Sequence, residues 1–337
     1  MEVLDLIIVG GGPIGIACGL EAQKKGLSYL ILEKGPIVNS LYNYPVNMQF
    51  FSSSEKLEID EIPFISNEAK PKRNEALEYY RRIVTSNNLN INLFEKVISV
   101  SKAQEIFTVI SDKKEYHSKN IIVATGFYDI PNKLNIPGED LPKVSHYYKD
   151  PHFFSGQKLA IVGASNSAID AALECYRKGA AVTLIIRGTE VGQRVKYWVR
   201  PDIINRIKEG SIAVFYKSEV EKITEKEISI KTKNGTKKLQ NDFVLALIGY
   251  KPNFIFLENL PETHNNILWI GCRRYNKAEF SILAASGRKV TVVDIDPYVE
   301  KFSMNFPFYA LNVCELPDDW SSNFDAIFMN GVFGDGL

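Results

Sequence analysis

The sequence predicts an α/β protein that repeats one folding pattern three times. A short apolar stretch of strand length runs into a glycine at residues 5–10, 158–163 and 266–271. Each is followed by a helix-length segment and then by a second apolar strand that ends in a charged residue. This order is typical of a parallel sheet with a ligand-binding loop after its first strand. We therefore expect two Rossmann-like dinucleotide-binding domains, with a partial third Rossmann-like unit at the C-terminus.

Composition excludes several classes of function. The chain has 337 residues, 45% of them hydrophobic and 24% charged, and its formal net charge is zero. These values indicate a globular protein and give no reason to expect binding to nucleic acid or an anionic membrane. The longest apolar runs are interrupted by glycines, so no membrane span is expected. The first residues carry acids where a signal peptide needs positive charge, so we expect a cytoplasmic protein.

Cysteine spacing argues against metal and dithiol chemistry. Cys18, Cys175, Cys272 and Cys314 lie far apart, and no C-x-x-C motif occurs. A zinc site or a vicinal redox pair is therefore not expected. Thiols in a reducing compartment explain these residues.

The first pattern, "DLIIVGGGPIGIACGLEAQKKGLSYLILE" (residues 5–33), predicts a dinucleotide site. Gly10, Gly12 and Gly15 form G-x-G-x-x-G, in which the glycines permit a tight turn, a close approach to pyrophosphate and close helix packing. Pro13 begins the helix, whose N-terminus favours a phosphate. The second strand ends at Glu33, beside Lys34, about 20 positions after the first glycine, where an acid accepts hydrogen bonds from ribose hydroxyls.

A second stretch favours FAD at this first site. "NIIVATGFYDIPNKLNIPGED" (120–140) is a buried strand ending in Ala124, Thr125 and Gly126. It resembles the A-T-G strand at which flavoproteins with two dinucleotide domains leave the FAD domain. We therefore expect these three residues to help form the FAD site.

The second pattern, "KLAIVGASNSAIDAALECYRKGAAVTLIIR" (158–187), predicts an NADPH site. Gly163, Ser165 and Ala168 occupy the three glycine positions, and Ser165, Asn166 and Ser167 are candidates to cap the helix. The second strand ends at Arg187 instead of an acid. A guanidinium can bind a 2′-phosphate that an acid would repel, which favours NADPH over NADH. Arg194 and Lys196 are candidates to assist, or are solvated surface charges.

These patterns define the expected domains. We predict an FAD-binding domain at 1–150, an NADPH-binding domain at 151–253, a linker at 254–266 and the partial Rossmann-like unit at 267–337.

Residues 1–256 resemble the YpdA-type flavoproteins, a group of bacillithiol-disulfide reductases with a thioredoxin-reductase-like fold. The resemblance rests on "GGGPIG", "YNYPVNMQFFSSSEKLEIDEIPF", "KPKRNEALEYYRRIV", "ATGFYDIPNKLNIPGEDLPKVSHYYKDPHFF" and "IVGASNSAIDAALE", of which residues 48–64 are the most specific. It implies FAD, NADPH and reduction of a low-molecular-weight disulfide or other small electron acceptor. It also leaves a homodimer open.

Two departures from the family stand out. Many members carry a cysteine in the phosphate loop where this chain has Ile14, and Cys18 lies one helical turn later. The catalytic residues therefore stay unknown, and a reductase that uses the flavin alone, or an oxidase, is an alternative. The segment that closes the FAD domain in the superfamily is also not recognisable after Pro252.

The C-terminal pattern resembles the first half of a class I S-adenosylmethionine-dependent methyltransferase. "NILWIGC", "KVTVVDID", "PFYALNV" and "FDAIFMN" are expected strands. By position Gly271 and Asp294, or Asp296, would contact the cofactor. Only one loop glycine is present and four of about seven strands are found, so we expect no binding of S-adenosylmethionine. We expect two incomplete coding segments joined near 254–266; alternatives are strands that complete the FAD domain, or a bifunctional enzyme.

Three other functions compete with a disulfide reductase. A flavin monooxygenase is suggested by His146 and Phe154 before the second glycine loop, although the F-x-G-x-x-x-H motif is not met and His146 is readily explained as a linker residue. A methyltransferase fragment fused to a flavoprotein and a non-catalytic nucleotide-binding protein are the others.

Overall fold

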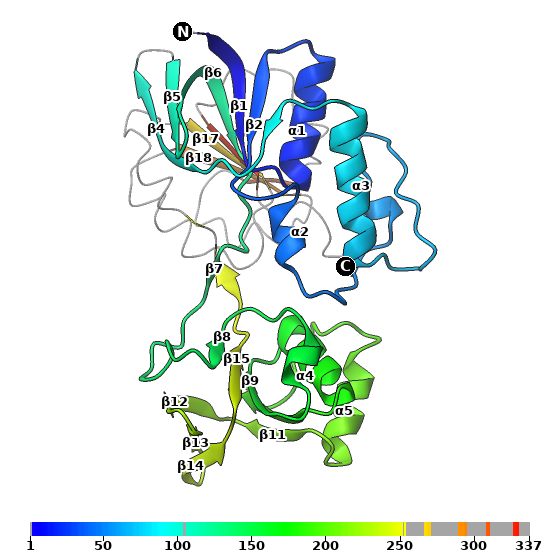
Figure 1. The fold of residues 1–337 in the computed structure, drawn as a ribbon, viewed down its shortest axis with the longest axis vertical. Helices are drawn as coiled ribbons and strands as arrows, with labels where there is room; N and C mark the ends of the chain where they lie inside the picture. The colour runs from blue at the N-terminus through cyan, green and yellow to red at the C-terminus, as the bar shows by residue number, and fades with distance from the viewer. Residues whose placement is uncertain are drawn as a thin grey trace. The chain divides into compact units, whose positions relative to one another are not determined.

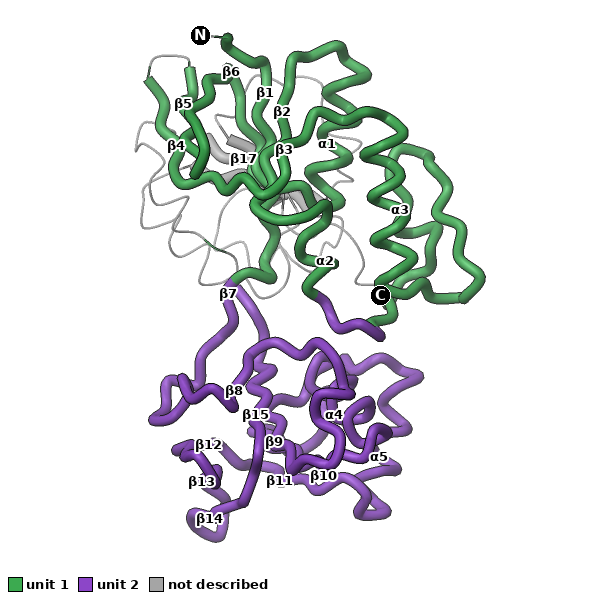
Figure 2. The backbone as a smooth tube through the Cα atoms, viewed as in Figure 1, with its two compact units in different colours: residues 1–43, 48–129, 252–337 green, residues 44–47, 130–251 purple. Residues whose placement is uncertain are grey.

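A computed structural model of the chain describes residues 2–103, 106–251 and 253, and four C-terminal strands at 266–270, 289–294, 308–310 and 326–329. The chain divides into two compact units (Figure 2). Unit 1 comprises Met1–Asn43, Met48–Asp129 and Pro252–Leu337, and unit 2 comprises Tyr44–Asn47 and Ile130–Lys251. The predicted α/β class is confirmed.

Unit 1 is built around a large, mainly parallel sheet (Figure 1). Its helical elements are α1 (Pro13–Lys24), α2 (Asn39–Asn43), the 3-10 helix η1 (Glu55–Leu57) and α3 (Arg73–Ser86). Its strands are β1 (Val3–Val9), β2 (Tyr29–Leu32), β3 (Ile91–Asn92), β4 (Val97–Ala103), β5 (Ile106–Ser111), β6 (Glu115–Val123), β17 (Asn266–Ile270), β18 (Lys289–Asp294), β19 (Phe308–Ala310) and β20 (Ala326–Met329).

The strand order of unit 1 places the two predicted motifs side by side. The order is β19-β18-β17-β20-β6-β1-β2-β3, with the antiparallel pair β4-β5 attached to β6 through β5. Strand β1 lies between β2 and β6 and is parallel to both, with Val9 opposite Leu32 on one side and Val123 on the other. Ile7 and Ile8 are fully buried, as expected for a strand covered on both faces. The carboxyl ends of β1, β2 and β6 therefore meet at one edge.

Helix α3 illustrates how the sequence pattern fixes the packing. Ala76, Tyr79, Tyr80 and Ile83 recur at helical spacing and are all buried. Its first turn is closed by Glu75, whose carboxylate accepts the backbone N–H of Lys72 over 2.8 Å. The helix thus begins after an acid-capped turn and buries one apolar face.

Unit 2 repeats the arrangement of unit 1. Its strands are β7 (Ile130–Pro131), β8 (Val144–Ser145), β9 (Lys158–Val162), β10 (Ala181–Ile186), β11 (Ala213–Tyr216), β12 (Glu219–Ile223), β13 (Glu227–Thr232), β14 (Gly235–Gln240), β15 (Phe243–Ala246) and β16 (Tyr250–Lys251). Its helices are η2 (Pro151–Phe154), α4 (Asn166–Arg177) and α5 (Arg200–Lys208). The parallel sheet has the order β11-β10-β9-β15-β8, so β9 lies between β10 and β15 as β1 lies between β2 and β6.

The sheet of unit 2 is buried on both faces. Leu159 and Ile161 of β9 pack in the core that includes α4, whereas Ala160 and Val162 pack in a second core on the opposite face. Residues of β12 and β13 contribute to that second core. Alternate residues of one strand thus support two layers.

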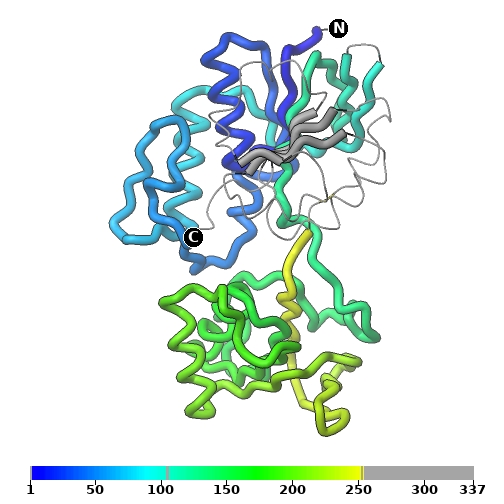
Figure 3. Tube along the Cα trace, turned by 180° about the vertical axis from the view of Figure 1, so that it is seen from behind, coloured from blue at the N-terminus to red at the C-terminus, as the bar shows by residue number. Residues whose placement is uncertain are grey.

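The observed unit boundary differs from the predicted one at residue 150. Residues 130–150 belong to unit 2, because β7 pairs with β16 and β8 pairs with β15. The two segments that connect the units run side by side as β7 and β16 (Figures 1 and 3), with Ile130 opposite Lys251. Two-residue strands carry almost no periodic signal, so these two strands could not be predicted from the sequence pattern.

The four C-terminal strands predicted from the sequence are confirmed as β17 to β20, and they belong to unit 1. They are parallel, and their order β19-β18-β17-β20 is the 3-2-1-4 order of a doubly wound half-sheet. Strand β20 pairs with β6, with Ile327 opposite Ile122 and Phe328 opposite Val123. These strands therefore extend the sheet of unit 1, which was one of the alternatives. The predicted junction at 254–266 lies almost wholly outside the described residues.

Candidate functional site

The first glycine loop connects β1 to α1 and touches the A-T-G segment. Gly10 has φ of +110°, a conformation that favours glycine. A Cβ built on Gly10 would lie 2.4 Å from the carbonyl oxygen of Ala124 and 3.2 Å from the nitrogen of Thr125. Two predicted site segments more than 100 residues apart in the sequence are thus in direct contact, and only glycine fits between them.

Gly15 and Gly12 have different roles in this loop. A Cβ on Gly15 would lie 1.8 Å from the carbonyl oxygen of Gly10, so Gly15 is required for α1 to pack against the loop. A Cβ on Gly12 would meet nothing within 4 Å. Gly12 is the N-cap of α1, has no side-chain capping bond, and is followed by Pro13. The start of the helix is therefore open to an anionic ligand.

The acid at the end of β2 holds the loop from the other side. Glu33 is 6% exposed and accepts the N–H of Gly11 over 2.7 Å and that of Gly35 over 2.9 Å. Burial raises the pKa of Glu33, while the two N–H groups oppose that rise. Lys34 forms an ion pair with Asp129 at the surface. The carboxylate predicted to bind ribose is thus also bonded to the phosphate loop.

The A-T-G segment continues directly from β6. The N–H of Ala124 donates to the carbonyl oxygen of Val9 over 2.7 Å, which keeps the segment beside the end of β1. Gly126 has φ of +68° and turns the chain away from the sheet. Ala124, Thr125 and Gly126 therefore follow β6 directly, and Ala124 is bonded to the end of β1.

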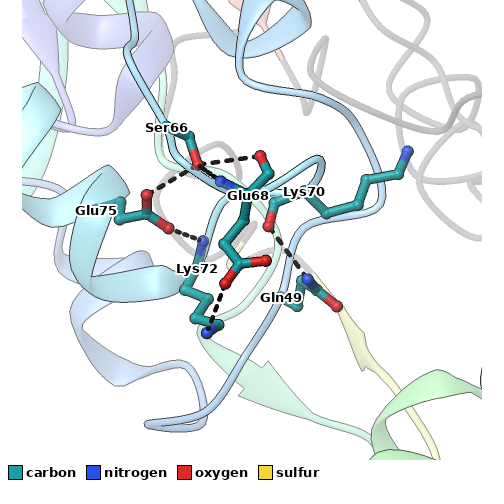
Figure 4. Close-up of polar contacts among 6 residues, drawn as sticks. All are labelled: Gln49, Ser66, Glu68, Lys70, Lys72 and Glu75. Atoms are coloured by element: carbon teal, nitrogen blue, oxygen red, sulfur yellow. Dashed lines mark hydrogen bonds and ion pairs between the residues drawn. The ribbon is translucent and has the colours of Figure 1, made fainter.

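Residues 48–73 form the irregular segment that leads into α3 and contacts its first turn (Figure 4). Gln49 bridges to Lys72, and its side chain donates to the carbonyl oxygen of Lys70 over 3.2 Å. The Ser66 hydroxyl donates to Glu75 over 2.8 Å. Ser52 and Ser54, in the stretch most specific to the family, are buried. Polar contacts to the start of α3 thus fix the conformation of this stretch.

The second glycine loop reproduces the geometry of the first. Gly163 has φ of +139°, and a Cβ there would lie 2.5 Å from the carbonyl oxygen of Leu247 and 3.0 Å from Cβ of Ala168. Ala168 is fully buried, so a small residue is required where the third glycine stood in the first loop. Leu247 follows β15 as Ala124 follows β6.

The predicted capping of α4 is wrong in its details. Ser165 is the N-cap in an extended conformation but makes no side-chain capping bond. Asn166 uses its side chain to bind residues 194–196 instead. Ser165 and Ser167 are exposed, so the helix start remains accessible.

Arg187, which was predicted to bind the 2′-phosphate, follows β10 and is exposed. Lys217, which the sequence reasoning missed, lies beside it: its backbone N–H donates to the carbonyl oxygen of Gly188 over 2.9 Å. A side-chain hydrogen bond with Lys233, and next the repulsion between the two charges, lower the pKa of Lys217. The parallel pairing of Ile186 with Tyr216 is what brings the ends of β10 and β11 together. The pairing of β10 with β11 is therefore the signal that could have identified Lys217.

Arg194 and Lys196, the remaining basic candidates, differ in their exposure to solvent. Arg194 is exposed. Lys196 is only 8% exposed, and its Nζ lies 2.8 Å from Oδ2 of Asp170. Lys196 is therefore neither a solvated surface charge nor a group directed at a ligand, because its ammonium is already neutralised by Asp170.

Comparison with known proteins decides the family. Residues 7–281 match the family model described as pyridine nucleotide-disulphide oxidoreductase. The chain belongs to this family. It is 43% identical to bacilliredoxin reductase Bdr from Bacillus subtilis (strain 168), over 75% of this chain and 79% of that protein. It is also similar to the structure of bacillithiol disulfide reductase Bdr (YpdA) from Staphylococcus aureus, with a TM-score of 0.76, 42% identity, and coverage of 77% of this chain and 80% of that one.

The predicted oxidoreductase class and thioredoxin-reductase-like fold are thus confirmed for this member of the pyridine nucleotide-disulphide oxidoreductase family. A flavin monooxygenase from Stenotrophomonas maltophilia also matches, with a TM-score of 0.65, 22% identity and coverage of 77% and 82%. Identity at that level shows a shared fold alone. Within the part of the chain that the structure describes, no helix is long and apolar enough to cross a membrane.

The two thiols that the structure describes do not have the properties of redox nucleophiles. Cys18 lies on α1, and burial raises its pKa to about 12. Cys175 on α4 is fully buried, and burial raises its pKa to about 12 as well. A thiol with such a pKa is almost wholly protonated at neutral pH, and the thiolate is the reactive form. Cys272 and Cys314 lie outside the described residues.

His146 lies inside unit 2, where it is 9% exposed. Its Nε2 is 3.4 Å from Oε1 of Glu139, itself buried, and burial lowers the pKa of His146. The backbone carbonyl of His146 accepts the hydroxyl of Tyr250 over 3.2 Å. His146 thus lies directly after β8, buried within unit 2.

The predicted cofactor residues of the C-terminal region are only partly described. Asp294 is the last residue of β18, opposite Ala310 of β19, and Gly271 lies outside the described residues. The methyltransferase interpretation finds no support in the comparisons. Among the residues placed by the structure, no cluster of histidine, cysteine or acidic side chains could hold a metal ion.

Proposed function

We propose that the chain is an NADPH-dependent FAD oxidoreductase that reduces a low-molecular-weight disulfide. The observation that carries this proposal is the contrast between the two repeated loops. The first ends its second strand on Glu33, buried and bonded to the loop, and the second ends on the exposed Arg187. An acid suits ribose hydroxyls and a guanidinium suits a 2′-phosphate, so the two loops fit FAD and NADPH respectively.

The residues present fit the FAD pyrophosphate and ribose. Gly12 faces open space at the start of α1, and Gly10 allows close contact with the A-T-G segment. We assign Gly10, Gly12, Pro13, Gly15, Glu33, Lys34, Ala124, Thr125 and Gly126 to this site. When bound, FAD would supply the two-electron relay between NADPH and the acceptor.

The second loop fits NADPH by the same reasoning. Gly163 and Ala168 keep the start of α4 compact, while Ser165, Asn166 and Ser167 surround its N-terminal end. Arg187 would bind the 2′-phosphate, with Lys217 adding positive charge from the neighbouring strand. This charge distribution would make the site selective for NADPH over NADH.

The proposed reaction transfers two electrons from NADPH, by way of FAD, to the disulfide. The S–S bond is broken, NADPH becomes NADP⁺, and two thiols form with uptake of one proton from solvent. Bacillithiol disulfide is the proposed substrate, since the similar structure from Staphylococcus aureus is a bacillithiol disulfide reductase. Cys18 and Cys175 have no role in this reaction, so the electrons would pass without a cysteine pair from the described part of the chain.

We also propose that the protein works in a reducing compartment. Cys18 and Cys175 are both thiols, which suits the cytoplasm. We leave the homodimer suggested by the family resemblance as a prediction.

The test uses the full chain and three measurements. The purified protein should be yellow, should bleach anaerobically with NADPH more readily than with NADH, and should oxidise NADPH faster when bacillithiol disulfide is added. A protein that binds no FAD even when FAD is supplied in excess would overturn the proposal. A C4a-hydroperoxide absorbance in air without disulfide turnover would favour the monooxygenase instead.

A further inference from the structure

The loop between β10 and α5 (residues 187–199) lies against the second phosphate loop. The N–H of Gly192 donates to the carbonyl oxygen of Ala164 over 2.9 Å. A Cβ built on Gly192 would lie 2.7 Å from that oxygen, so this approach requires glycine. Val191 and Val195 are 2% and 3% exposed and pack in the core of unit 2. The loop is therefore held in contact with the predicted pyrophosphate-binding residues.

Asn166 fastens the middle of this loop to the first turn of α4. Its Oδ1 accepts the N–H of Lys196 over 2.8 Å, and its Nδ2 donates to the carbonyl oxygen of Arg194 over 3.2 Å. One amide thus spans residues 194–196. The backbone of Arg194 is thereby placed at the helix end that would face the phosphates, and its side chain is exposed.

Asp170 and Lys196 form the third attachment, one helical turn beyond Asn166. Residues four apart on a helix share a face, so Asn166 and Asp170 both contact the loop. The side chains of Lys196 and Asp170 are 10% and 23% exposed. A buried ion pair adds little net stability because desolvation offsets its attraction, but it fixes geometry since breaking it leaves an unpaired charge.

We infer that Asp170 and Lys196 are positioning residues for recognition of the 2′-phosphate of NADPH. They hold the loop that runs from the end of β10 past the start of α4, and with it the backbone of Arg194, whose guanidinium would then supplement that of Arg187. Each member of the pair is bonded to the other, so we assign neither a contact with the cofactor. This inference rests on the proposed NADPH site, and it goes beyond it by assigning selectivity to a pair outside the cofactor contacts.

Calorimetric titration of the full chain with NADP⁺ and with NAD⁺ tests the inference. Lys196→Met keeps the apolar stem and removes the charge, and Asp170 retains access to water. We expect the Kd for NADP⁺ to rise about tenfold, since a misplaced guanidinium loses its phosphate bonds, while the Kd for NAD⁺ changes less than about twofold. Lys196→Arg, which restores the ion pair, should recover most of the NADP⁺ affinity.

Two further variants complete the design. Lys178→Met, at the exposed far end of α4, is the matched control and should leave both affinities unchanged. Asp170→Asn keeps one acceptor oxygen, so it should lower the affinity for NADP⁺ by a smaller factor than Lys196→Met does. It replaces Lys196→Met if that variant does not fold.

The outcomes separate this inference from the proposed function. A native chain that binds no NADP⁺ overturns the proposed function and the inference with it. If the native chain binds NADP⁺ more tightly than NAD⁺, and Lys196→Met keeps the same ratio of the two Kd values, the inference alone is overturned. Equal losses for NADP⁺ and NAD⁺ with a lower Tm would show that the pair only stabilises the fold.

Discussion

The backbone N–H of Gly11 donates a hydrogen bond to Oε2 of Glu33 over 2.7 Å, in the interior of unit 1. Because Oε1 accepts the N–H of Gly35, both carboxylate oxygens are used to hold backbone at the phosphate loop. The residue that would bind ribose therefore also determines the shape of the loop that would bind pyrophosphate.

Glu33→Gln should weaken both FAD binding and the fold. The amide NH₂ would face one of the two backbone N–H groups, leaving a buried donor unpaired at a cost of about 1–3 kcal/mol in the free energy of unfolding. Urea denaturation and the FAD retained after ultrafiltration measure the two effects. Glu21→Gln on the exposed face of α1 is the control. Full retention of FAD and stability in Glu33→Gln would contradict the assignment.

Two glycine substitutions should separate binding from folding. Gly12→Ala places a methyl group in open space at an ordinary φ of −75°, so stability should stay within about 0.5 kcal/mol of native while FAD affinity falls at least tenfold. Gly15→Ala forces a methyl group onto the Gly10 carbonyl oxygen and should destabilise by about 1–3 kcal/mol or more. Thermal unfolding and FAD titration of both variants provide the measurement. Normal FAD binding by Gly12→Ala would mean that the ligand does not approach there.

Substitution of Arg187 should change the choice of nicotinamide cofactor. Arg187→Gln removes the bidentate partner of the 2′-phosphate, so the ratio of kcat/KM for NADPH to that for NADH should fall about 10- to 100-fold. Lys217→Gln should lower the same ratio by a smaller factor, because Lys217 adds charge without the guanidinium geometry. Lys208→Gln, exposed at the end of α5, should have no effect. An unchanged ratio in Arg187→Gln would place the 2′-phosphate elsewhere.

Cys18→Ser should leave disulfide reduction unchanged. With a pKa raised to about 12 by burial, the Cys18 thiol is almost entirely protonated at pH 7. Steady-state NADPH oxidation with the disulfide, compared between native protein and Cys18→Ser at equal FAD content, is the measurement. A loss of more than about tenfold in kcat would show that Cys18 acts as a redox thiol after all.

The acid sensitivity of unit 1 should depend on Asp5. Its carboxylate accepts hydrogen bonds from Lys119 over 2.7 Å and from the Ser28 hydroxyl over 2.7 Å, which hold the pKa of Asp5 well below its usual range. A lowered pKa in the folded state stabilises the protein above the ordinary pKa of about 4, and this contribution is lost as pH falls below it. Asp5→Asn should therefore flatten the dependence of Tm on pH below about pH 4.

Asp140→Asn provides the comparison for Asp5, since the Asp140 side chain is 96% exposed. Its dependence of Tm on pH should match that of the native protein. If Asp5→Asn gave the native dependence too, the hydrogen bonds of Asp5 would have no role in acid unfolding.

The two glycine loops could be predicted because their determinants are local. Gly10 and Gly163 follow buried strands directly, and the charges at Glu33 and Arg187 end the next strand in each unit. Short-range spacing therefore specified the fold of both units, and the charges at the strand ends support the proposed cofactor of each. The spacing did not reveal that Glu33 would be bonded to Gly11, which depends on the packing of β2 against the loop.

The residues that were missed or misjudged depend on contacts distant in sequence. Lys217 lies beside Gly188 because β11 pairs with β10, and Lys196 is buried because Asp170 neutralises it. A single sequence contains the charges but not their partners. The same limit applies to β20, whose pairing with β6 extends the sheet of unit 1.

The pairing of Ile130 with Lys251 has a consequence for folding kinetics. The first and last residues of the inserted segment, Ile130 and Lys251, are neighbours in β7 and β16. Once that unit has folded, the chain before it and the chain after it are therefore held close together. The entropy lost on closing a loop grows with the length of flexible chain between its ends. Early folding of the insertion therefore lowers the entropic barrier to assembling β6 with strands from beyond residue 251, and makes unit 1 dependent on unit 2 for its rate of formation.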